Sequence, residues 1–267
     1  MNFGLLGDRL GHSLSPQIHQ EVFRQLGMEA TYELIEVPVE KLADKVAELR
    51  KTYRGLNVTI PHKVAVMDSL DHIAAEAKAI GAVNTVLFDN SGAAGFNTDY
   101  FGFARLLEHN GLVPKGKDVC VLGTGGASRA ILQCVKDMQA HSITVISRVI
   151  ENAPVDMRAH YTVKTYQDLK ILGGDLLINC TPVGMFPKTD ASPVDGTVME
   201  HFAAAVDIIY NPAETKFMKL ARQQGKTAVN GLFMLVAQAV AADEIWLGRK
   251  LDAGMIADVT DKIAKLL

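Results

Sequence analysis

The chain has 267 residues, of which 48% are hydrophobic and 21% are charged, and its formal net charge is −3 at pH 7. This length exceeds that of a typical single domain and predicts two domains or one large α/β domain, of which we expect two. The balanced charge provides no electrostatic footprint for nucleic acid or for a membrane surface, so we expect neither as a partner.

The N-terminus and the lack of a long apolar run predict a cytoplasmic location. Residues 1–8 place no basic region before a hydrophobic stretch, and no apolar run approaches the roughly 20 residues that span a bilayer. The cysteines Cys120, Cys134 and Cys180 are widely spaced within apolar segments, which favours buried structural thiols over a disulfide framework or a metal cluster. The eight histidines show no metal-ligand spacing, so we expect no metal site.

Residues 1–100 alternate between strand and helix patterns. Ser15 and Pro16 are typical of a helix cap and a first helical turn, and apolar residues then follow at helical spacing. The expected elements are strands at 3–7, 32–37 and 56–60 and helices at 15–26 and 42–53. Such a βαβαβ run predicts a mostly parallel sheet. Residues 83–88 and 95–98, separated by the turn 89–92, predict a hairpin at the edge of that sheet.

Polar side chains gather at the end of the third predicted strand. Alternation over residues 56–60 directs Asn57 and Thr59 to the face opposite the apolar side chains, and Pro61 ends the strand. Lys63 lies in the turn that follows. A carboxamide, a hydroxyl and an amine close together indicate a binding or catalytic site; the alternative is an edge strand with a solvated face and an ordinary surface lysine.

A second α/β series follows a stretch rich in glycine, proline and lysine at residues 111–117. The expected elements are strands at 118–122, 142–146, 176–179, 205–209 and 227–229 and helices at 231–247 and 253–267. We expect the last two helices to return and pack on the first domain. The predicted domains are therefore residues 1–101 plus about 238–267 and residues 102–237.

A glycine-rich turn, Gly123-Thr124-Gly125-Gly126-Ala127, connects a predicted strand to a predicted helix. Strand, turn and helix in this order form a dinucleotide cradle, because glycines allow close backbone approach and the helix N-terminus faces the pyrophosphate. Ser128 occupies the third glycine position of the usual Gly-x-Gly-x-x-Gly pattern, so the turn alone is weak evidence.

The end of the next predicted strand bears on the choice of cofactor. It carries Ser147 and Arg148, and no acid occurs until Glu151, which favours the 2′-phosphate of NADP over the free ribose of NAD. The alternative is that Arg148 is a solvated loop residue. Further on, residues 179–185 place a proline and glycine turn after a buried strand, where it would border a nicotinamide.

These ordered motifs resemble those of the shikimate dehydrogenase family over nearly the whole chain. The resemblance implies an α/β fold, in which an N-terminal α/β substrate domain with a mostly parallel sheet is joined to a Rossmann-type dinucleotide-binding domain. The segments that carry it are His12-Ser13-Leu14-Ser15-Pro16, Asn57-Val58-Thr59-Ile60-Pro61-His62-Lys63, Gly81-Ala82-Val83-Asn84-Thr85, Asn97-Thr98-Asp99, the loop 123–130, Asp207-Ile208-Ile209-Tyr210-Asn211-Pro212 with Thr215, and Asn230-Gly231 with Met234, Leu235 and Gln238.

The resemblance also implies a function: reversible, NADP-dependent reduction of 3-dehydroshikimate to shikimate in the shikimate pathway of chorismate and aromatic amino acid biosynthesis, by a monomer or homodimer. Lys63 is the candidate proton donor and Asp99 its partner, because ketone reduction places negative charge on oxygen. The implied substrate-binding residues are Ser13, Ser15, Asn57, Thr59, Lys63, Asn84, Asp99, Tyr210 and Gln238. The implied cofactor-binding residues are Gly123, Thr124, Gly125, Gly126, Ala127, Ser147, Arg148, Thr181, Val183, Met185, Gly231 and Met234.

One departure from the family pattern keeps other functions open. NADP-dependent members usually carry Asn-Arg-Thr and a further basic residue, whereas here Ser147-Arg148-Val149 is followed by no second basic residue nearby. The alternatives are an NAD-dependent or dual-specificity quinate/shikimate dehydrogenase and a catalytically silent shikimate-binding regulatory module. The paired serines Ser13 and Ser15 favour shikimate as substrate, and the intact Lys63, Asp99 and glycine loop argue against a silent module.

Overall fold

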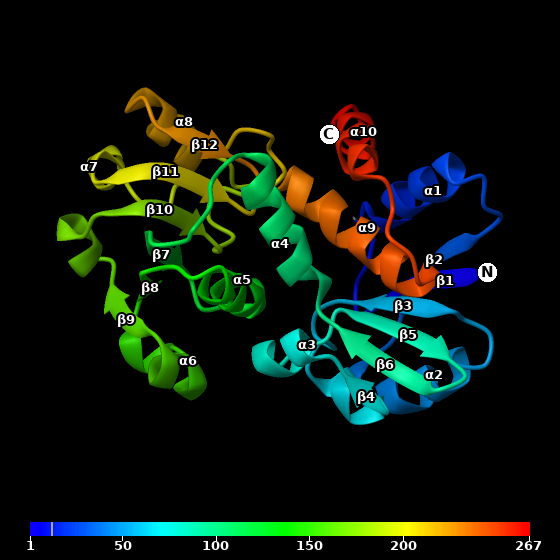
Figure 1. The fold of residues 1–267 in the computed structure, drawn as a ribbon. Coiled ribbons are helices and arrows are strands. Elements are labelled where there is room, and N and C mark those ends of the chain that lie inside the picture. Colours follow the sequence, from blue (N-terminus) through cyan, green and yellow to red (C-terminus); the bar gives the residue numbers. More distant parts are fainter. Residues whose placement is uncertain (12) are drawn as a thin grey trace. The chain divides into compact units, whose positions relative to one another are not determined.

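The computed structural model describes residues 1–11 and 13–267, and the chain forms two compact units (Figure 1). One unit contains Met1–Gly102 and Val236–Leu266, and the other contains Phe103–Leu235. The boundaries fall within helices α4 (Thr98–His109) and α9 (Leu232–Leu247). Each unit is built on a six-stranded sheet with helices, which confirms the predicted α/β class. In the described part of the chain, no helix combines the length and apolarity needed to cross a membrane.

The first unit has a mixed sheet with the strand order β2-β1-β3-β5-β6-β4. The strands are β1 (Asn2–Gly7), β2 (Thr31–Glu36), β3 (Gly55–Val58), β4 (His72–Ile73), β5 (Thr85–Asp89) and β6 (Gly92–Phe96). Strand β1 pairs parallel with β2 and β3, as predicted, and β5 and β6 form the predicted antiparallel hairpin. The hairpin does not lie at the edge, because β4 pairs with β6 and covers it. Two residues are too few to show a strand period, so β4 left no sequence signal.

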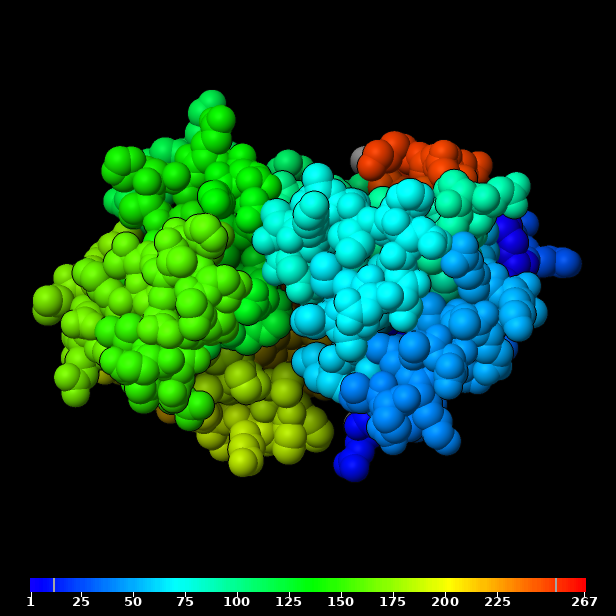
Figure 2. Space-filling view, turned by 90° about the horizontal axis from the view of Figure 1, so that it is seen from below, coloured from blue at the N-terminus to red at the C-terminus, as the bar shows by residue number. Residues whose placement is uncertain are grey.

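Two apolar cores lie on opposite faces of this sheet. Along β1, Phe3 and Leu5 pack toward Trp246 of α9, whereas Leu6 packs with the apolar residues of α2. The helices of this unit are α1 (Ser15–Gln25), α2 (Leu42–Leu49), α3 (Ala75–Ile80) and α10 (Ala253–Ala264), with the 3-10 turns η1 (Val39–Lys41) and η2 (Ala65–Ser69). The segments of α2 and α3 form the outer surface of this unit in the view of Figure 2.

Strand β3 places its residues alternately against the two cores. Gly55 lies under the Trp246 indole, and a Cβ at this position would come within 2.1 Å of the indole nitrogen, so only glycine fits. Asn57 lies two residues further along and therefore faces the same side as Gly55. The strand ends at Val58, earlier than predicted, and Ile60 is 74% exposed in the following turn instead of sharing a face with Leu56 and Val58.

Helix α1 begins one residue earlier than its cap signal predicted. Ser15 is the first helical residue and Leu14 occupies the N-cap, so Ser15 is not the cap. The Ser13 side chain takes part of that role, because its Oγ accepts the Ser15 backbone N–H at 3.2 Å.

The second unit has a fully parallel sheet with the order β12-β11-β10-β7-β8-β9. The strands are β7 (Asp118–Leu122), β8 (Ser142–Ser147), β9 (Thr162–Thr165), β10 (Gly174–Asn179), β11 (Phe202–Asp207) and β12 (Thr227–Val229). Taken from β9, this is the 3-2-1-4-5-6 order of a Rossmann fold, whose ligand site lies where the order reverses, here between β7 and β10. Strand β9 was not predicted, and β11 begins three residues before its predicted start.

The elements that connect these strands are short. They are α5 (Gly126–Asp137), α6 (Val155–His160), α7 (Gly196–Glu200) and α8 (Lys216–Gln223), with the 3-10 turns η3 (Ile150–Asn152) and η4 (Asp168–Ile171). Helices α7 and α8 contribute apolar side chains to the core on one face of the sheet. The thiols of Cys120, Cys134 and Cys180 are unpaired and buried in this unit, which confirms the prediction of structural cysteines.

Candidate active site

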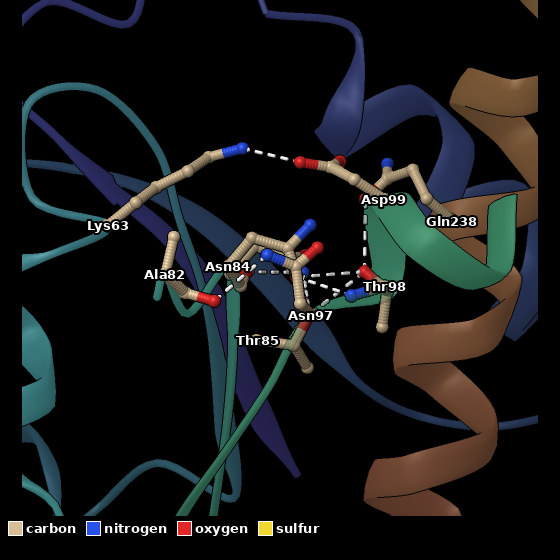
Figure 3. Close-up of polar contacts among 9 residues, drawn as sticks. Lys63, Ala82, Asn84, Thr85, Asn97, Thr98, Asp99 and Gln238 are labelled. Carbon is tan, nitrogen blue, oxygen red and sulfur yellow. Dashed lines mark hydrogen bonds and ion pairs between the residues drawn. The ribbon is translucent and has the colours of Figure 1, made fainter. Parts of the chain in front are cut away.

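Lys63 and Asp99 form an ion pair in the first unit. Lys63 lies in the turn after β3, Asp99 lies in the first turn of α4, and Lys63 Nζ is 2.7 Å from Asp99 Oδ2 (Figure 3). The side chains are 23% and 17% exposed, respectively, so the pair is sheltered and still open to a small molecule. A lysine held by a carboxylate in this setting can donate a proton to a bound oxygen as the ammonium and accept one from it as the neutral amine.

The turn that carries Lys63 is anchored on both sides of this residue. The buried ring of His62 donates from Nε2 to the Val37 carbonyl at 2.8 Å. The Lys63 carbonyl accepts the Val83 N–H, also at 2.8 Å. These bonds fix the backbone of the turn, so Lys63 extends its side chain from a rigid base.

Asn84 ties the start of α4 to β5 and so positions Asp99. The Asn84 Oδ1 atom accepts the Thr98 backbone N–H at 2.6 Å and the Thr85 hydroxyl at 3.0 Å. The Thr98 hydroxyl also lies 3.4 Å from Gln238 Oε1, which brings α9 into the same network (Figure 3). Asn84 is buried, and its Oδ1 atom is already used by hydrogen bonds within the protein.

The remaining predicted substrate residues of the first unit differ in their exposure. Ser13, Ser15 and Thr59 are partly exposed, whereas Asn57 is only 5% exposed. His12, the first residue of that motif, lies outside the described residues.

A cavity of about 610 Å³ opens in the second unit where the strand order reverses. Its walls come from the loops after β7, β8 and β10, as expected for a dinucleotide site. The predicted cofactor residues that line it are Gly123, Thr124, Gly125, Ser147, Arg148, Thr181 and Val183. The predicted residues outside its lining are Gly126, Ala127, Met185, Gly231 and Met234.

The glycine loop leaves room in front of α5. Gly125 is the N-cap of this helix, and a Cβ at Gly125 or Gly126 would meet no atom within 4 Å, so the space is open to a ligand. Gly123 has φ +99°, a conformation that favours glycine. Ser128, at the third glycine position, is buried and donates from Oγ to the Gly125 carbonyl at 2.6 Å, which explains how a serine is accommodated there.

Several residues of the cavity lining had not been identified as cofactor residues in the sequence, among them Ser192, Pro193, Asn152 and Tyr166. Asn152 and Tyr166 line the same cavity as Arg148. Burial raises the pKa of Tyr166, and the nearby Arg148 guanidinium lowers it in part, which places the two groups close to each other. The sequence indicated a place for Asn152 in the cofactor site only weakly, as a polar residue four positions after Arg148. It gave no such indication for Tyr166, which follows the unpredicted strand β9.

Asp207 belongs to a buried hydrogen-bond network that reaches the wall of the cavity. It is fully buried at the end of β11 and accepts bonds from Asn179 Nδ2 at 3.0 Å and from Thr215 Oγ1 at 2.7 Å. Asn179 Oδ1 in turn accepts the Thr181 hydroxyl at 2.7 Å, so the network reaches the cavity wall. Burial raises the pKa of Asp207 to about 6, and its hydrogen bonds oppose that rise.

The late motifs lie around the end of β11. Tyr210 belongs to the second unit and is partly buried, which raises the pKa of its hydroxyl. Gly231 is tightly packed, since a Cβ there would come within 2.0 Å of the Ile208 carbonyl oxygen. Met234 is buried at the start of α9, and Met185 is exposed.

Comparison with known proteins gives consistent matches. The family model for the shikimate dehydrogenase substrate binding domain matches residues 5–86. The shikimate dehydrogenase (NADP(+)) of Clostridium beijerinckii is 42% identical over 251 residues, which are 94% of this chain and 93% of that protein.

Two solved structures have the same fold over almost the whole chain. A chorismate mutase/shikimate 5-dehydrogenase fusion protein from Clostridium acetobutylicum aligns with a TM-score of 0.96 and 45% identity, covering 99% of this chain and 97% of that one. Shikimate 5-dehydrogenase from Thermus thermophilus, in complex with NADP(H) and shikimate, aligns with a TM-score of 0.88 and 33% identity, covering 98% of this chain and 99% of that one.

Proposed function

The chain belongs to the shikimate dehydrogenase family, and on this premise we propose that it catalyses the reversible NADP-dependent reduction of 3-dehydroshikimate to shikimate. This reaction is a step of chorismate and aromatic amino acid biosynthesis. The observation that carries the proposal is the sheltered contact of 2.7 Å between Lys63 and Asp99, within a substrate-domain fold shared with enzymes of this name.

The Lys63–Asp99 pair supplies the proton chemistry that the reaction needs. NADPH, when bound, supplies the hydride. Negative charge then develops on the ketone oxygen, and the Lys63 ammonium donates a proton to that oxygen. Asp99 holds the Lys63 amine in place, and in the direction of oxidation Lys63 accepts the proton from the substrate hydroxyl.

The polar groups around this pair suit a small polyhydroxy acid. Ser13 and Ser15 donate to the substrate carboxylate, as the family resemblance implies. Thr59 and Gln238 bind substrate hydroxyls. The bonds to Asn84 Oδ1 fix its amide, so that Nδ2 is the group presented to the substrate. Tyr210 is a further residue that the family resemblance assigns to the substrate.

The cavity of the second unit fits NADP. The open space at Gly125 and Gly126 lies at the N-terminus of α5, where backbone N–H groups and the helix dipole favour a pyrophosphate. Arg148 is the positively charged group of the cavity lining and pairs with the 2′-phosphate. Thr181 and Val183 border the nicotinamide half, as do Met185, Gly231 and Met234. Ser147, Thr124 and Ala127 complete the proposed cofactor set.

One assay tests this function. Purified protein is mixed with shikimate and either NADP+ or NAD+, and the absorbance of the reduced nicotinamide is followed. We expect turnover with shikimate, faster with NADP+ than with NAD+. Binding of shikimate without turnover would identify a regulatory module instead, and equal turnover of quinate would identify a dual-specificity enzyme. A cytoplasmic location and a monomeric or homodimeric state stay predictions from the sequence.

A further inference from the structure

A buried hydrogen-bond network joins Asn57, a predicted substrate residue, to His19 and Asp243. The proposed proton chemistry does not use this network. His19 of α1 lies between two partners: its Nδ1 is 2.9 Å from Asp243 Oδ1, and its Nε2 is 3.0 Å from Asn57 Oδ1. Asp243 comes from α9 and Asn57 from β3, so three elements meet here. His19 and Asp243 are fully buried.

The contacts of Asn57 determine which way its carboxamide points. Its Nδ2 lies 3.1 Å from the Thr85 hydroxyl and 3.4 Å from the Asn84 backbone carbonyl. A carbonyl oxygen only accepts hydrogen bonds, so the amide nitrogen must be on that side. The Oδ1 atom therefore faces His19 and also accepts the Tyr32 hydroxyl at 2.7 Å.

This orientation fixes the protonation of His19. Asn57 Oδ1 is an acceptor, so His19 Nε2 must carry a proton. The contact between Nδ1 and Asp243 Oδ1 then needs one proton of its own. That proton belongs either to an imidazolium facing a carboxylate or to a carboxylic acid facing a neutral imidazole. Both arrangements have zero net charge and both keep the Nε2–H donor.

The His19 ring is held in its plane by packing. It stacks on the Tyr32 ring with a centroid distance of 4.2 Å and an interplanar angle of 12°, and the centroid of the Trp246 ring lies 5.3 Å away. Tyr32 therefore both packs against His19 and donates to the same Asn57 oxygen. Two donors fully occupy Asn57 Oδ1, and Nδ2 faces the Thr85 hydroxyl and the Asn84 carbonyl, so the protein holds the whole carboxamide in one orientation.

We propose that His19 and Asp243 are positioning residues for substrate binding, and this proposal rests on the proposed function. His19 Nε2–H locks the Asn57 carboxamide so that its N–H groups face Thr85 and the backbone carbonyl of Asn84, a proposed substrate residue, and Asp243 holds the ring that does so. Through Thr85, Asn57 also touches the Asn84 and Thr98 network that sets the start of α4. Loss of the lock should weaken shikimate binding without changing cofactor binding.

The protonation of His19 is tested directly by NMR on protein labelled with ¹⁵N-histidine, with His19→Gln used to assign the signal. We expect His19 Nε2 to show a directly bonded proton that persists from pH 6 to pH 8. A signal typical of an unprotonated Nε2 would overturn the proposal, because Asn57 Oδ1 cannot donate to it. This measurement needs no turnover and so remains decisive even if the proposed function fails.

Kinetics of matched variants test the positioning role. His19→Phe keeps an aromatic ring but removes the donor, and we expect the KM for shikimate to rise about 10-fold while the KM for NADP+ stays within about twofold. Asp243→Leu leaves Nδ1 without a partner and should raise the same KM about five-fold. Asp243→Asn can turn its amide N–H toward Nδ1 and preserve the Nε2 donor, so it should restore most of the affinity.

The outcomes separate the proposal from its alternatives. Asp258→Leu, on the exposed face of α10, serves as the control for an aspartate-to-leucine change. A His19→Phe variant with the parent's KM for shikimate, equal rises in both KM values, or an Asp243→Asn variant as impaired as Asp243→Leu would each overturn the positioning role. If the parent protein does not oxidise shikimate, the proposed function fails instead. If His19→Phe does not fold, the two Asp243 variants and the NMR measurement decide.

Discussion

Lys63 Nζ lies 2.7 Å from Asp99 Oδ2, although the two residues are 36 positions apart in the chain. The turn after β3 supplies the amine and the start of α4 supplies the carboxylate. Each is fixed by separate hydrogen bonds, from Val83 to the Lys63 carbonyl and from Thr98 to Asn84. The geometry of the pair is therefore set by the fold and does not depend on a bound substrate.

Lys63→Ala should lower kcat by about 10²–10⁴-fold with a smaller change in the KM for shikimate, because general acid–base assistance acts mainly in the transition state. Steady-state kinetics with shikimate and NADP+ measure both constants. Lys78→Ala, on the surface of α3, provides the control and should leave both unchanged. A Lys63→Ala variant as active as the parent would remove this residue from the mechanism.

Asp99→Asn is nearly isosteric and removes the charge that holds Lys63, so it should also lower kcat. If the two residues act as a unit, the Lys63→Ala/Asp99→Asn double variant should lose less than the product of the two single losses. A double-mutant cycle on kcat measures this coupling. Fully multiplicative losses would show that the residues act independently.

Ser13→Ala and Ser15→Ala should each raise the KM for shikimate, because each removes a hydrogen bond to the substrate carboxylate. The loss of binding free energy should be about 1–3 kcal/mol for each variant. The KM for NADP+ should stay unchanged. Ser91→Ala, in the exposed turn between β5 and β6, is the matched control. A rise confined to the KM for NADP+ would place this motif outside the substrate site.

The fold was predictable where strands are buried and apolar. The bounds predicted for β7 (Asp118–Leu122) are those observed, because a central parallel strand is apolar along almost its whole length. Strand β9 (Thr162–Thr165) could not be predicted, since its four residues are threonine, valine, lysine and threonine and none is fully buried. Short polar edge strands carry no period that distinguishes them from loops.

The candidate site was predictable as a set of residue types but not as a network. Lys63, Asp99 and Asn84 stand in recognisable motifs. His19 and Asp243 do not, because they are 224 positions apart and meet only when α1 and α9 pack on the same sheet. No local pattern in the sequence indicates such a contact. Tyr166 was missed in the cofactor cavity for the same reason, since its position depends on tertiary packing.

The buried carboxyl of Asp207 should make folding sensitive to pH. Its pKa is about 6 in the folded protein and near 3.8 when unfolded, so the stability that it contributes is present below pH 3.8 and is lost as the pH rises through 6. The loss amounts to about 3 kcal/mol.

Asp207→Asn removes this titration. The free energy of unfolding of the variant minus that of the parent should therefore increase by about 3 kcal/mol as the pH rises from about 4 to 7. Urea denaturation across this range measures the difference, with exposed Asp258→Asn as the control. A parallel pH dependence for parent and Asp207→Asn would contradict the raised pKa.

The choice of cofactor depends on Arg148, which is exposed at the end of β8 and lines the cavity of the second unit with Asn152 and Tyr166. Arg148→Ala should raise the KM for NADP+ far more than the KM for NAD+, because only the 2′-phosphate carries a charge for the guanidinium to meet. Arg249→Ala, exposed after α9, controls for the loss of a surface arginine.

The same contact predicts the size of the preference and its response to salt. An exposed pair is screened by ions, so the preference for NADP+ should weaken as ionic strength rises. Because the second basic residue usual in this family is missing, we expect kcat/KM to favour NADP+ over NAD+ by only about 10- to 100-fold, or roughly 1.4–2.7 kcal/mol. Measuring kcat/KM for both cofactors, at low and high salt, decides the matter. A parent enzyme that prefers NAD+, or an Arg148→Ala variant that loses both activities equally, would show that Arg148 does not read the 2′-phosphate.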